Sequence, residues 1–184
     1  IGDTVVVFAQ GPIGLCATAG ARLLGATTII AVDGNDHRLG IAQKMGADVT
    51  LNFKNCDVID EIMKITGGRG ADSAIEALGT QATFESALRS IKPGGTLSSL
   101  GVYSEDLKIP LSAFAAGLGD HKINTALCPG GKERMRRLMN VLASNRLDLG
   151  LLVTHQYKLD DIVAAYDLFA HQRDGVLKVA ITPQ

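Results

Sequence analysis

The chain has 184 residues, of which 46% are hydrophobic, and a formal net charge of −1. The length suits one full α/β domain with some residues left over, and the near-neutral charge argues against binding to nucleic acid or to an anionic membrane surface. No apolar run approaches the roughly 20 residues that a membrane span needs. The cysteines lie far apart without a C-x-x-C pair, which argues against a disulfide framework and a structural zinc site and favours a reduced, cytoplasmic setting.

The first predicted element is a strand followed at once by a glycine-containing turn. Apolar residues 5–8 fit a buried parallel strand, and a helix begins at Pro12, a residue that suits the first helical turn. Gly11 and Gly14 would let a pyrophosphate approach the unpaired amides at the start of this helix. The dinucleotide fingerprint is G-x-G-x-x-G, however, and Ala9 occupies its first position. The turn alone is therefore a weak signal.

The second predicted strand strengthens this interpretation. Residues 28–32 form another apolar run, and Asp33 follows it about 20 residues after Gly14, where a carboxylate can accept hydrogen bonds from an adenosine ribose. The strand, the turn, the helix and this acid together favour a dinucleotide site over a βαβ turn that needs glycine only to be tight.

Strand and helix patterns go on alternating, which is typical of a parallel doubly wound sheet. The other predicted elements are a helix at 12–24, a helix with apolar residues between 39 and 45, a strand at 48–51, a helix at 57–65, a strand at 73–77, a helix at 80–91, a turn at 92–95, a strand at 96–100 and a sixth strand at 123–128. The predicted fold class is α/β, with a six-stranded Rossmann sheet of order 3-2-1-4-5-6 that binds ligands at the carboxyl ends of its strands.

The last part of the chain has a different pattern. A helix at 133–144, apolar residues at 151–154, a helix at 160–170 and a strand at 177–181 do not fit another unit of the same sheet. We therefore predict a dinucleotide-binding domain at residues 1–131 and, at residues 132–184, a C-terminal helix with the returning part of a second, discontinuous domain. Because the first strand begins with almost no run-up and no initiator Met, we expect a piece of a longer chain.

Six short motifs occur in an order and at a spacing that point to one family. They are Gly11-Pro12-Ile13-Gly14, Val32-Asp33, Gly46-Ala47-Asp48, Gly70-Ala71-Asp72, Lys92-Pro93-Gly94-Gly95 and Leu152-Val153-Thr154-His155. In these motifs the chain resembles the medium-chain, zinc-type alcohol dehydrogenases over its whole length. Residues 121–122, 127–131 and 134–138 look most like the tetrameric secondary-alcohol dehydrogenase branch. The resemblance implies the NAD(H)-binding domain of an enzyme that transfers hydride between an alcohol, or its ketone, and NAD.

The resemblance also implies what this chain lacks. In the family, the catalytic zinc is held by a Cys, a His and either a second Cys or an Asp, all of which precede the first strand of the dinucleotide domain. No residue of this chain corresponds to them, nor to the four-cysteine structural zinc lobe. We expect no catalytic residue and no metal ligand here, and the chain alone should be inactive. A homo-oligomer, dimer or tetramer, is implied, in which dinucleotide domains pair edge to edge.

The resemblance implies coenzyme contacts at thirteen positions. Those on the adenosine and pyrophosphate side are Gly11, Pro12, Ile13, Gly14, Asp33, Arg38 and Lys178. Those on the nicotinamide side are Ala77, Leu78, Gly79, Leu100, Gly101 and Val102. At the end of strand two, NADP-using members have a small residue followed by Ser-Arg or similar. Here Asp33 would repel a 2′-phosphate, so we predict NAD, although Arg38 could neutralise a phosphate by swinging across.

Two other functions share this domain. A zinc-free medium-chain reductase of enones or quinones would differ in the upstream zinc ligands, and a non-catalytic NAD-binding regulatory module would not need residues 151–181. A methyltransferase would lack the Lys-Pro-Gly-Gly and Leu-Val-Thr-His segments. Outside the implied contacts, Glu76 is interpreted as salt-bridged or on a solvated rim, and Cys128 as a small packing residue.

Overall fold

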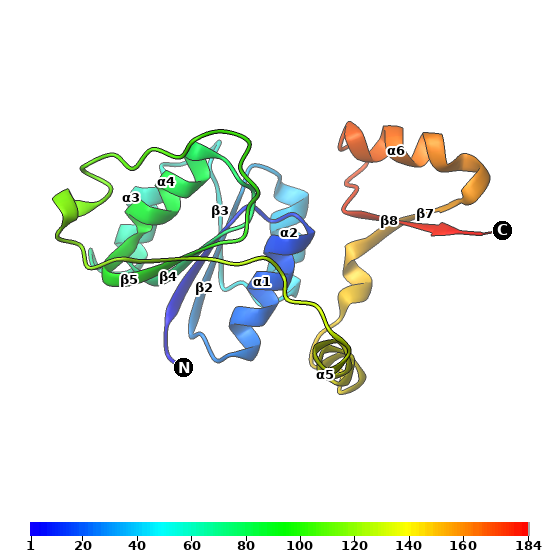
Figure 1. Cartoon of the computed structure of the whole chain (residues 1–184), viewed down its shortest axis with the longest axis horizontal. Helices are drawn as coiled ribbons and strands as arrows, with labels where there is room; N and C mark the ends of the chain where they lie inside the picture. The colour runs from blue at the N-terminus through cyan, green and yellow to red at the C-terminus, as the bar shows by residue number, and fades with distance from the viewer. Residues whose placement is uncertain (184) are drawn as a thin grey trace. The chain divides into compact units, whose positions relative to one another are not determined.

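The computed structural model describes residues 1–183, which form two compact units. The first is Ile1–Gly131, and the second runs from Lys132 onward (Figure 1). Within the described residues, no helix is long and apolar enough to cross a membrane.

A parallel sheet forms the centre of the first unit. Over the described residues it has six strands in the order β3-β2-β1-β4-β5-β6 (Figure 1), which confirms the predicted Rossmann topology. The strands are β1 Thr4–Phe8, β2 Thr28–Asp33, β3 Val49–Asn52, β4 Ala71–Glu76, β5 Ile91–Ser99 and β6 Lys122–Thr125. The central strand β1 pairs with β2 and β4, so that Val6 lies beside Ile30 on one side and Ala74 on the other.

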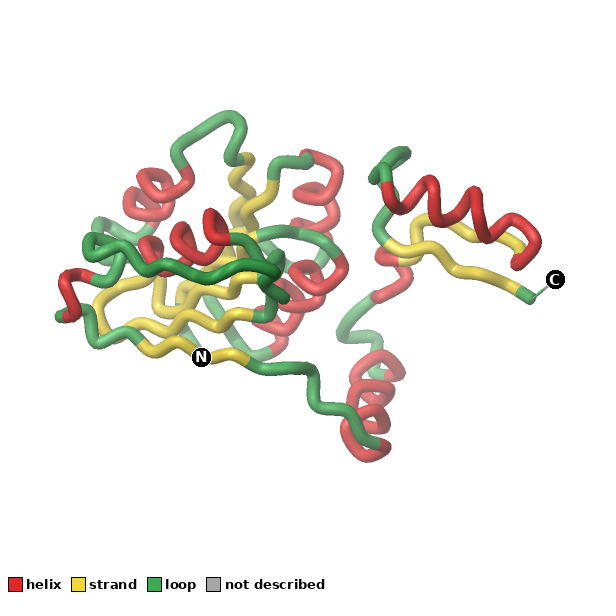
Figure 2. Tube along the Cα trace, turned by 45° about the horizontal axis from the view of Figure 1, so that its top comes forward, coloured by secondary structure: helices red, strands yellow, loops and turns green. Residues whose placement is uncertain are grey.

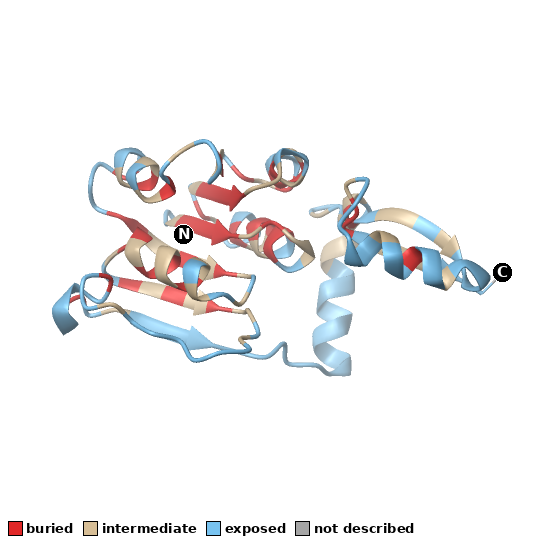
Figure 3. Ribbon diagram, turned by 90° about the horizontal axis from the view of Figure 1, so that it is seen from above, coloured by how far each residue is buried: buried red, intermediate tan, exposed pale blue. Residues whose placement is uncertain are grey.

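Helices cover both faces of this sheet. They are α1 Pro12–Leu23 and α2 Asp36–Lys44 on one face and α3 Val58–Ile65 and α4 Gln81–Ser90 on the other (Figure 1). Because both of its faces are covered, β1 is buried from Val5 to Phe8, and its sequence is a continuous apolar run rather than an alternating one. Figure 3 shows the buried residues concentrated in the sheet, whereas β6 is exposed along its length.

Two strand boundaries differ from the sequence-based prediction. Strand β5 begins at Ile91, so the Lys-Pro-Gly-Gly stretch that was expected as a turn lies inside it, where the pairing with β4 shifts register between Ala71 and Ser73. Strand β6 ends at Thr125, not at residue 128, because its partner β5 ends at Ser99, which is opposite Thr125. Beyond that pair, no strand among residues 1–183 lies beside β6 to bond it.

The second unit has its own small sheet. The elements of this unit are helix α5 Lys132–Ala143, strand β7 Val153–Lys158, helix α6 Ile162–Ala170 and strand β8 Lys178–Thr182. Strands β7 and β8 pair in parallel, and α6 packs beside them as the crossover (Figure 2). The predicted apolar segment at 151–154 is split between a 3-10 turn, Leu149–Leu152, and the start of β7. Helix α6 leaves Val163 78% and Tyr166 69% exposed.

Candidate functional site

The turn between β1 and α1 brings two backbone segments into direct contact. Ala9 has φ +70°, a left-handed conformation that costs an L-residue about 1 kcal/mol. A Cβ on Gly14 would overlap the Ala9 carbonyl oxygen and lie 2.9 Å from the carbonyl carbon. A Cβ on Gly11, in contrast, would have no atom within 4 Å. Gly14 is therefore the glycine that the geometry of this turn requires.

The start of α1 is open to an anion. Gly11 is the N-cap residue and supplies no side-chain hydrogen bond, and Pro12 has no amide hydrogen. The amides of the first helical turn, among them those of Ile13 and Gly14, have no carbonyl acceptor within the helix. Such amides, together with the positive end of the helix dipole, favour a phosphate group. The side chain of Ile13 is 56% exposed beside them.

Asp33 is fixed against this turn by main-chain amides. Its Oδ2 accepts a hydrogen bond from the Gln10 amide (2.6 Å) and its Oδ1 accepts one from the Asn35 amide (2.9 Å), and the residue is 7% exposed. The fully buried Gln10 is itself anchored, since its amide group donates to the Val7 carbonyl and its Oε1 accepts from the Thr18 hydroxyl. The structure thus brings the Gly11–Gly14 turn and Asp33 together, as the sequence predicts.

Arg38 and His37 lie in the first turn of α2, immediately after Asp33. The side chain of Asn35 caps this helix by accepting hydrogen bonds from the amides of His37 (2.9 Å) and Arg38 (3.4 Å). Arg38 is half-buried and His37 is exposed. A basic side chain therefore stands on the helix that begins beside the carboxylate.

The loops after β4 and β5 touch each other. Gly79 has φ +96°, and a Cβ on it would overlap the carbonyl oxygen of Val102. A Cβ on Gly101 would overlap the amide nitrogen of Gly79. The six residues predicted for the nicotinamide side therefore form one surface, on which Leu78 is 56% and Val102 83% exposed.

This surface adjoins the first turn. The Ala77 amide donates to the Phe8 carbonyl (3.1 Å), and the Ala77 Cβ lies 3.6 Å from the position that a Cβ on Gly14 would take. Twelve of the thirteen predicted contact residues thus lie at the carboxyl ends of β1, β2, β4 and β5 within the first unit. This is the edge at which open α/β sheets bind ligands.

Glu76, at the end of β4, does not match its interpretation as a rim or ion-pair residue. It is fully buried, and no Lys, Arg or His among residues 1–183 pairs with it. Its Oε1 accepts hydrogen bonds from the amides of Leu78 and Gly79, both at 2.8 Å. Its Oε2 accepts one from the Tyr103 hydroxyl at 2.7 Å. A usable signal was present in the sequence: an acid that ends a buried strand and precedes a glycine loop.

Burial and hydrogen bonding act on Glu76 in opposite directions. Burial alone raises the pKa of a carboxyl group, but the bonds from Tyr103, Gly79, Thr83 and Leu78 outweigh it and lower the pKa of Glu76 below its usual 4.5. Burial and the neighbouring carboxylate raise the pKa of Tyr103. The pair is therefore a carboxylate and a neutral phenol at neutral pH.

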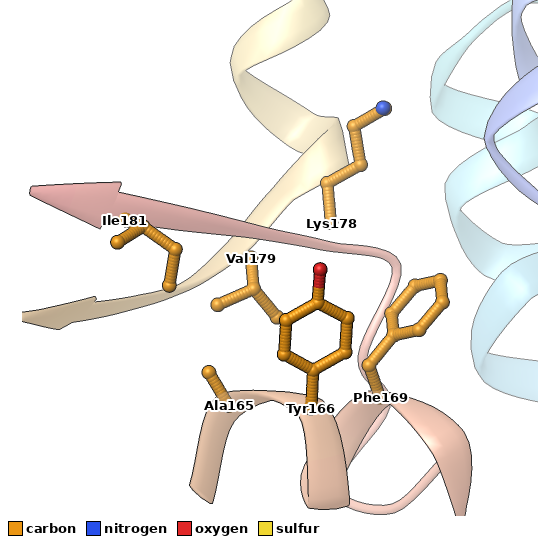
Figure 4. Close-up of a pocket in the computed structure, with 6 residues that line it drawn as sticks. All are labelled: Ala165, Tyr166, Phe169, Lys178, Val179 and Ile181. Carbon is orange, nitrogen blue, oxygen red and sulfur yellow. The ribbon is translucent and has the colours of Figure 1, made fainter. Parts of the chain in front are cut away.

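Lys178 belongs to the second unit. It is the first residue of β8 and lines an open pocket with residues of α6 and β8 (Figure 4). The pocket residues are Ala165, Tyr166, Phe169, Lys178, Val179 and Ile181. The role of Lys178 at a coenzyme stays a prediction. Over the part of the chain that the structure describes, no group of three or more His, Cys, Asp or Glu side chains could hold a metal ion.

Comparisons with known proteins agree with this geometry. A family model described as zinc-binding dehydrogenase matches residues 12–144. An alcohol dehydrogenase of Cupriavidus necator is 84% identical over 183 residues, which cover 100% of this chain and 50% of that protein. An NADP-dependent isopropanol dehydrogenase of Entamoeba histolytica is 35% identical over 184 residues, which cover 98% of this chain and 50% of that protein.

The chain is also similar to a solved structure over its whole length. The alcohol dehydrogenase TADH from Thermus sp. ATN1 superimposes with a TM-score of 0.89 at 30% identity, covering 100% of this chain and 52% of that one. The chain therefore spans about half the length of the curated relatives that it matches.

Proposed function

Because this chain belongs to the zinc-binding dehydrogenase family, we propose that it is the coenzyme-binding half of a zinc-dependent alcohol dehydrogenase. The observation that carries the proposal is the site at the end of β1, where Gly14 admits the Ala9 carbonyl and Asp33 is held beside the open start of α1. A zinc-free reductase of enones or quinones would share this domain, but the description of the family model favours the zinc type, and the names of the relatives favour an alcohol as substrate.

Different residues of the site would bind different parts of the coenzyme. Amides of the Gly11–Gly14 turn would bind the pyrophosphate, and Asp33 the ribose hydroxyls of the adenosine. The loops that carry Leu78 and Val102 would bind the nicotinamide end. The coenzyme itself supplies hydride-transfer chemistry, so the part played by this chain is binding and orientation. For Lys178 we propose a contact on the phosphate side.

We propose NAD rather than NADP as the coenzyme. Asp33 is almost fully buried with its two oxygens directed by main-chain amides, so it cannot turn away from a 2′-phosphate. A carboxylate in that position attracts a hydroxyl and repels a phosphate. The Entamoeba histolytica relative is named NADP-dependent, and Arg38 is the residue here that could support such a preference.

Titration of the chain with NADH and with NADPH tests both proposals. We expect NADH to bind at least tenfold more tightly, and Asp33→Ser to abolish that preference. Asp60→Ser, an exposed acid in the first turn of α3, is the control and should leave it unchanged. Equal or tighter binding of NADPH would overturn the choice of NAD, and a chain that binds neither would overturn the site.

For the longer enzyme we propose a small alcohol or ketone as substrate and a homo-oligomer as the assembled form. Strand β6 supports the second proposal, because it ends the sheet and its four residues are exposed. Analytical ultracentrifugation of the full-length enzyme tests it: we expect an oligomer, and a monomer would overturn the proposal.

A further inference from the structure

We propose that Glu76 is a positioning residue for the nicotinamide end of the coenzyme, because it fixes the loop after β4 and the loop after β5 in one arrangement. The inference rests on the proposed function of the site. It adds a role for a fully buried group that is not itself exposed on the surface carrying Leu78 and Val102 but holds the backbone of that surface in place.

One carboxylate oxygen of Glu76 organises the loop after β4. Oε1 accepts hydrogen bonds from the amides of Leu78 and Gly79, both at 2.8 Å, and from the hydroxyl of Thr83 at 2.7 Å. Thr83 is in the first turn of α4, whose N-cap is Thr80. The loop is thus tied at its middle and at its far end to the same atom.

The other oxygen organises the loop after β5. Oε2 accepts from the Tyr103 hydroxyl at 2.7 Å and lies 3.3 Å from the Ser99 hydroxyl, which is also 2.6 Å from that of Tyr103. The Tyr103 ring packs edge-on against Phe84, with centroids 6.1 Å apart, and Phe84 belongs to the buried core. Tyr103 therefore connects the carboxylate to a rigid part of the molecule.

The two loops also contact each other closely. Gly101 lies so close to the carboxylate that a Cβ on it would be 2.5 Å from Oε2 of Glu76, and so close to Gly79 that it would overlap its amide nitrogen. A displacement of one loop must therefore displace the other. Since no cation neutralises Glu76 within residues 1–183, these donors alone compensate its buried charge.

Glutamine at position 76 preserves the shape but not the acceptors. An amide has one oxygen, so the NH₂ group would face either the amides of Leu78 and Gly79 or the hydroxyl of Tyr103. In the second orientation the Tyr103 hydroxyl would have to accept a hydrogen bond instead of donating one, so in either case at least one loop loses the charged acceptor that holds it. Tyr103→Phe, by contrast, removes one donor and leaves the ring against Phe84.

The test compares a whole coenzyme with its adenosine half on the 184-residue chain. We expect Glu76→Gln to weaken NADH binding about tenfold, the ratio expected for one lost hydrogen bond to a charged group, while AMP binding stays within twofold. The rise in NADH fluorescence on binding, which reports the nicotinamide ring, should shrink in the same variant. Tyr103→Phe should weaken NADH about threefold and also leave AMP unchanged.

Two controls separate the possible outcomes. Asp33→Asn should weaken AMP and NADH together, and Glu61→Gln, a surface acid paired with Lys64, should change neither. Equal loss of AMP and NADH binding in Glu76→Gln, or no loss of either, overturns the positioning role. If Glu76→Gln does not fold, as judged by circular dichroism, Tyr103→Phe decides by the same criterion. An unmodified chain that binds neither AMP nor NADH refutes the proposed function itself.

Discussion

At the scale of single residues, the turn beside Gly14 leaves no room for a side chain at that position. A Cβ at this position would overlap the Ala9 carbonyl oxygen, so we expect Gly14→Ala to lower the free energy of unfolding by about 2 kcal/mol or more, through displacement of α1 from β1, and to weaken NADH binding. Urea denaturation measures the first effect. Gly20→Ala is the matched control in the same helix, where a Cβ meets nothing within 4 Å. It should raise stability by up to about 1 kcal/mol. Equal effects of the two substitutions would contradict the required contact.

The buried carboxylate of Glu76 should also determine how stability depends on acid. Its folded-state pKa lies below 4.5, so its contribution to the free energy of unfolding is fully present above about that pH and is lost as the pH falls through the folded-state pKa. Urea denaturation between pH 3 and pH 7 should therefore show that the free energy of unfolding falls less steeply with decreasing pH in Glu76→Gln than in the unmodified chain. Tyr103→Phe, which removes one donor, should give an intermediate slope. An unchanged decline in Glu76→Gln would contradict this account.

At the scale of single elements, the caps of two helices offer a matched pair. Asn35 caps α2 next to Asp33, and Asp57 caps α3 with bonds to the amides of Ile59 and Asp60. We expect Asn35→Ala and Asp57→Ala each to lower the free energy of unfolding by about 1 kcal/mol. Only Asn35→Ala should also weaken NADH binding, because its helix carries Arg38 and begins beside the ribose site. A loss of affinity in both variants would show that the effect is general destabilisation.

The elements of the first unit were predictable because their signals are local. Continuous apolar runs indicate strands that are covered on both faces, and the residues that end them, such as Asp33, lie at one edge by topology alone. The end of β6 was not predictable from its own residues, since it depends on where β5 stops. The prediction of a turn at the Lys-Pro-Gly-Gly stretch was wrong for a similar reason. The stretch lies inside β5 because the pairing of β5 with β4 shifts register there.

The site was predictable only where one segment determines its geometry. The turn at Gly11–Gly14 is such a segment. The network of Glu76 is not, because its donors come from residues separated along the sequence, with Tyr103 brought close by pairing of β4 and β5. Gln10 was missed for the same reason, since its amide holds Asp33, which lies 23 residues further along the sequence.

At the scale of the whole molecule, the division into two units is testable by cleavage. Residues 126–131, which lead from β6 to α5, are exposed and have no regular secondary structure. Limited proteolysis should therefore cut first in this segment, and the resulting first unit should keep AMP binding within twofold of the intact chain. Mass spectrometry locates the cut and titration measures the affinity. First cleavage inside α1 to α4, or loss of AMP binding by the product, would contradict the independence of the first unit.

The continuity of the first unit also bears on how the protein is made. All strands of its sheet, and twelve of the predicted coenzyme contacts, precede Lys132 in the chain, so the ribosome completes this unit before it begins α5. A ligand that binds only the folded form stabilises it by mass action, by about 2.7 kcal/mol when present at a hundred times its dissociation constant. Domains generally fold as units in the order of their synthesis. We therefore expect a cellular dinucleotide to bind the nascent chain and to stabilise its first unit before the second has emerged.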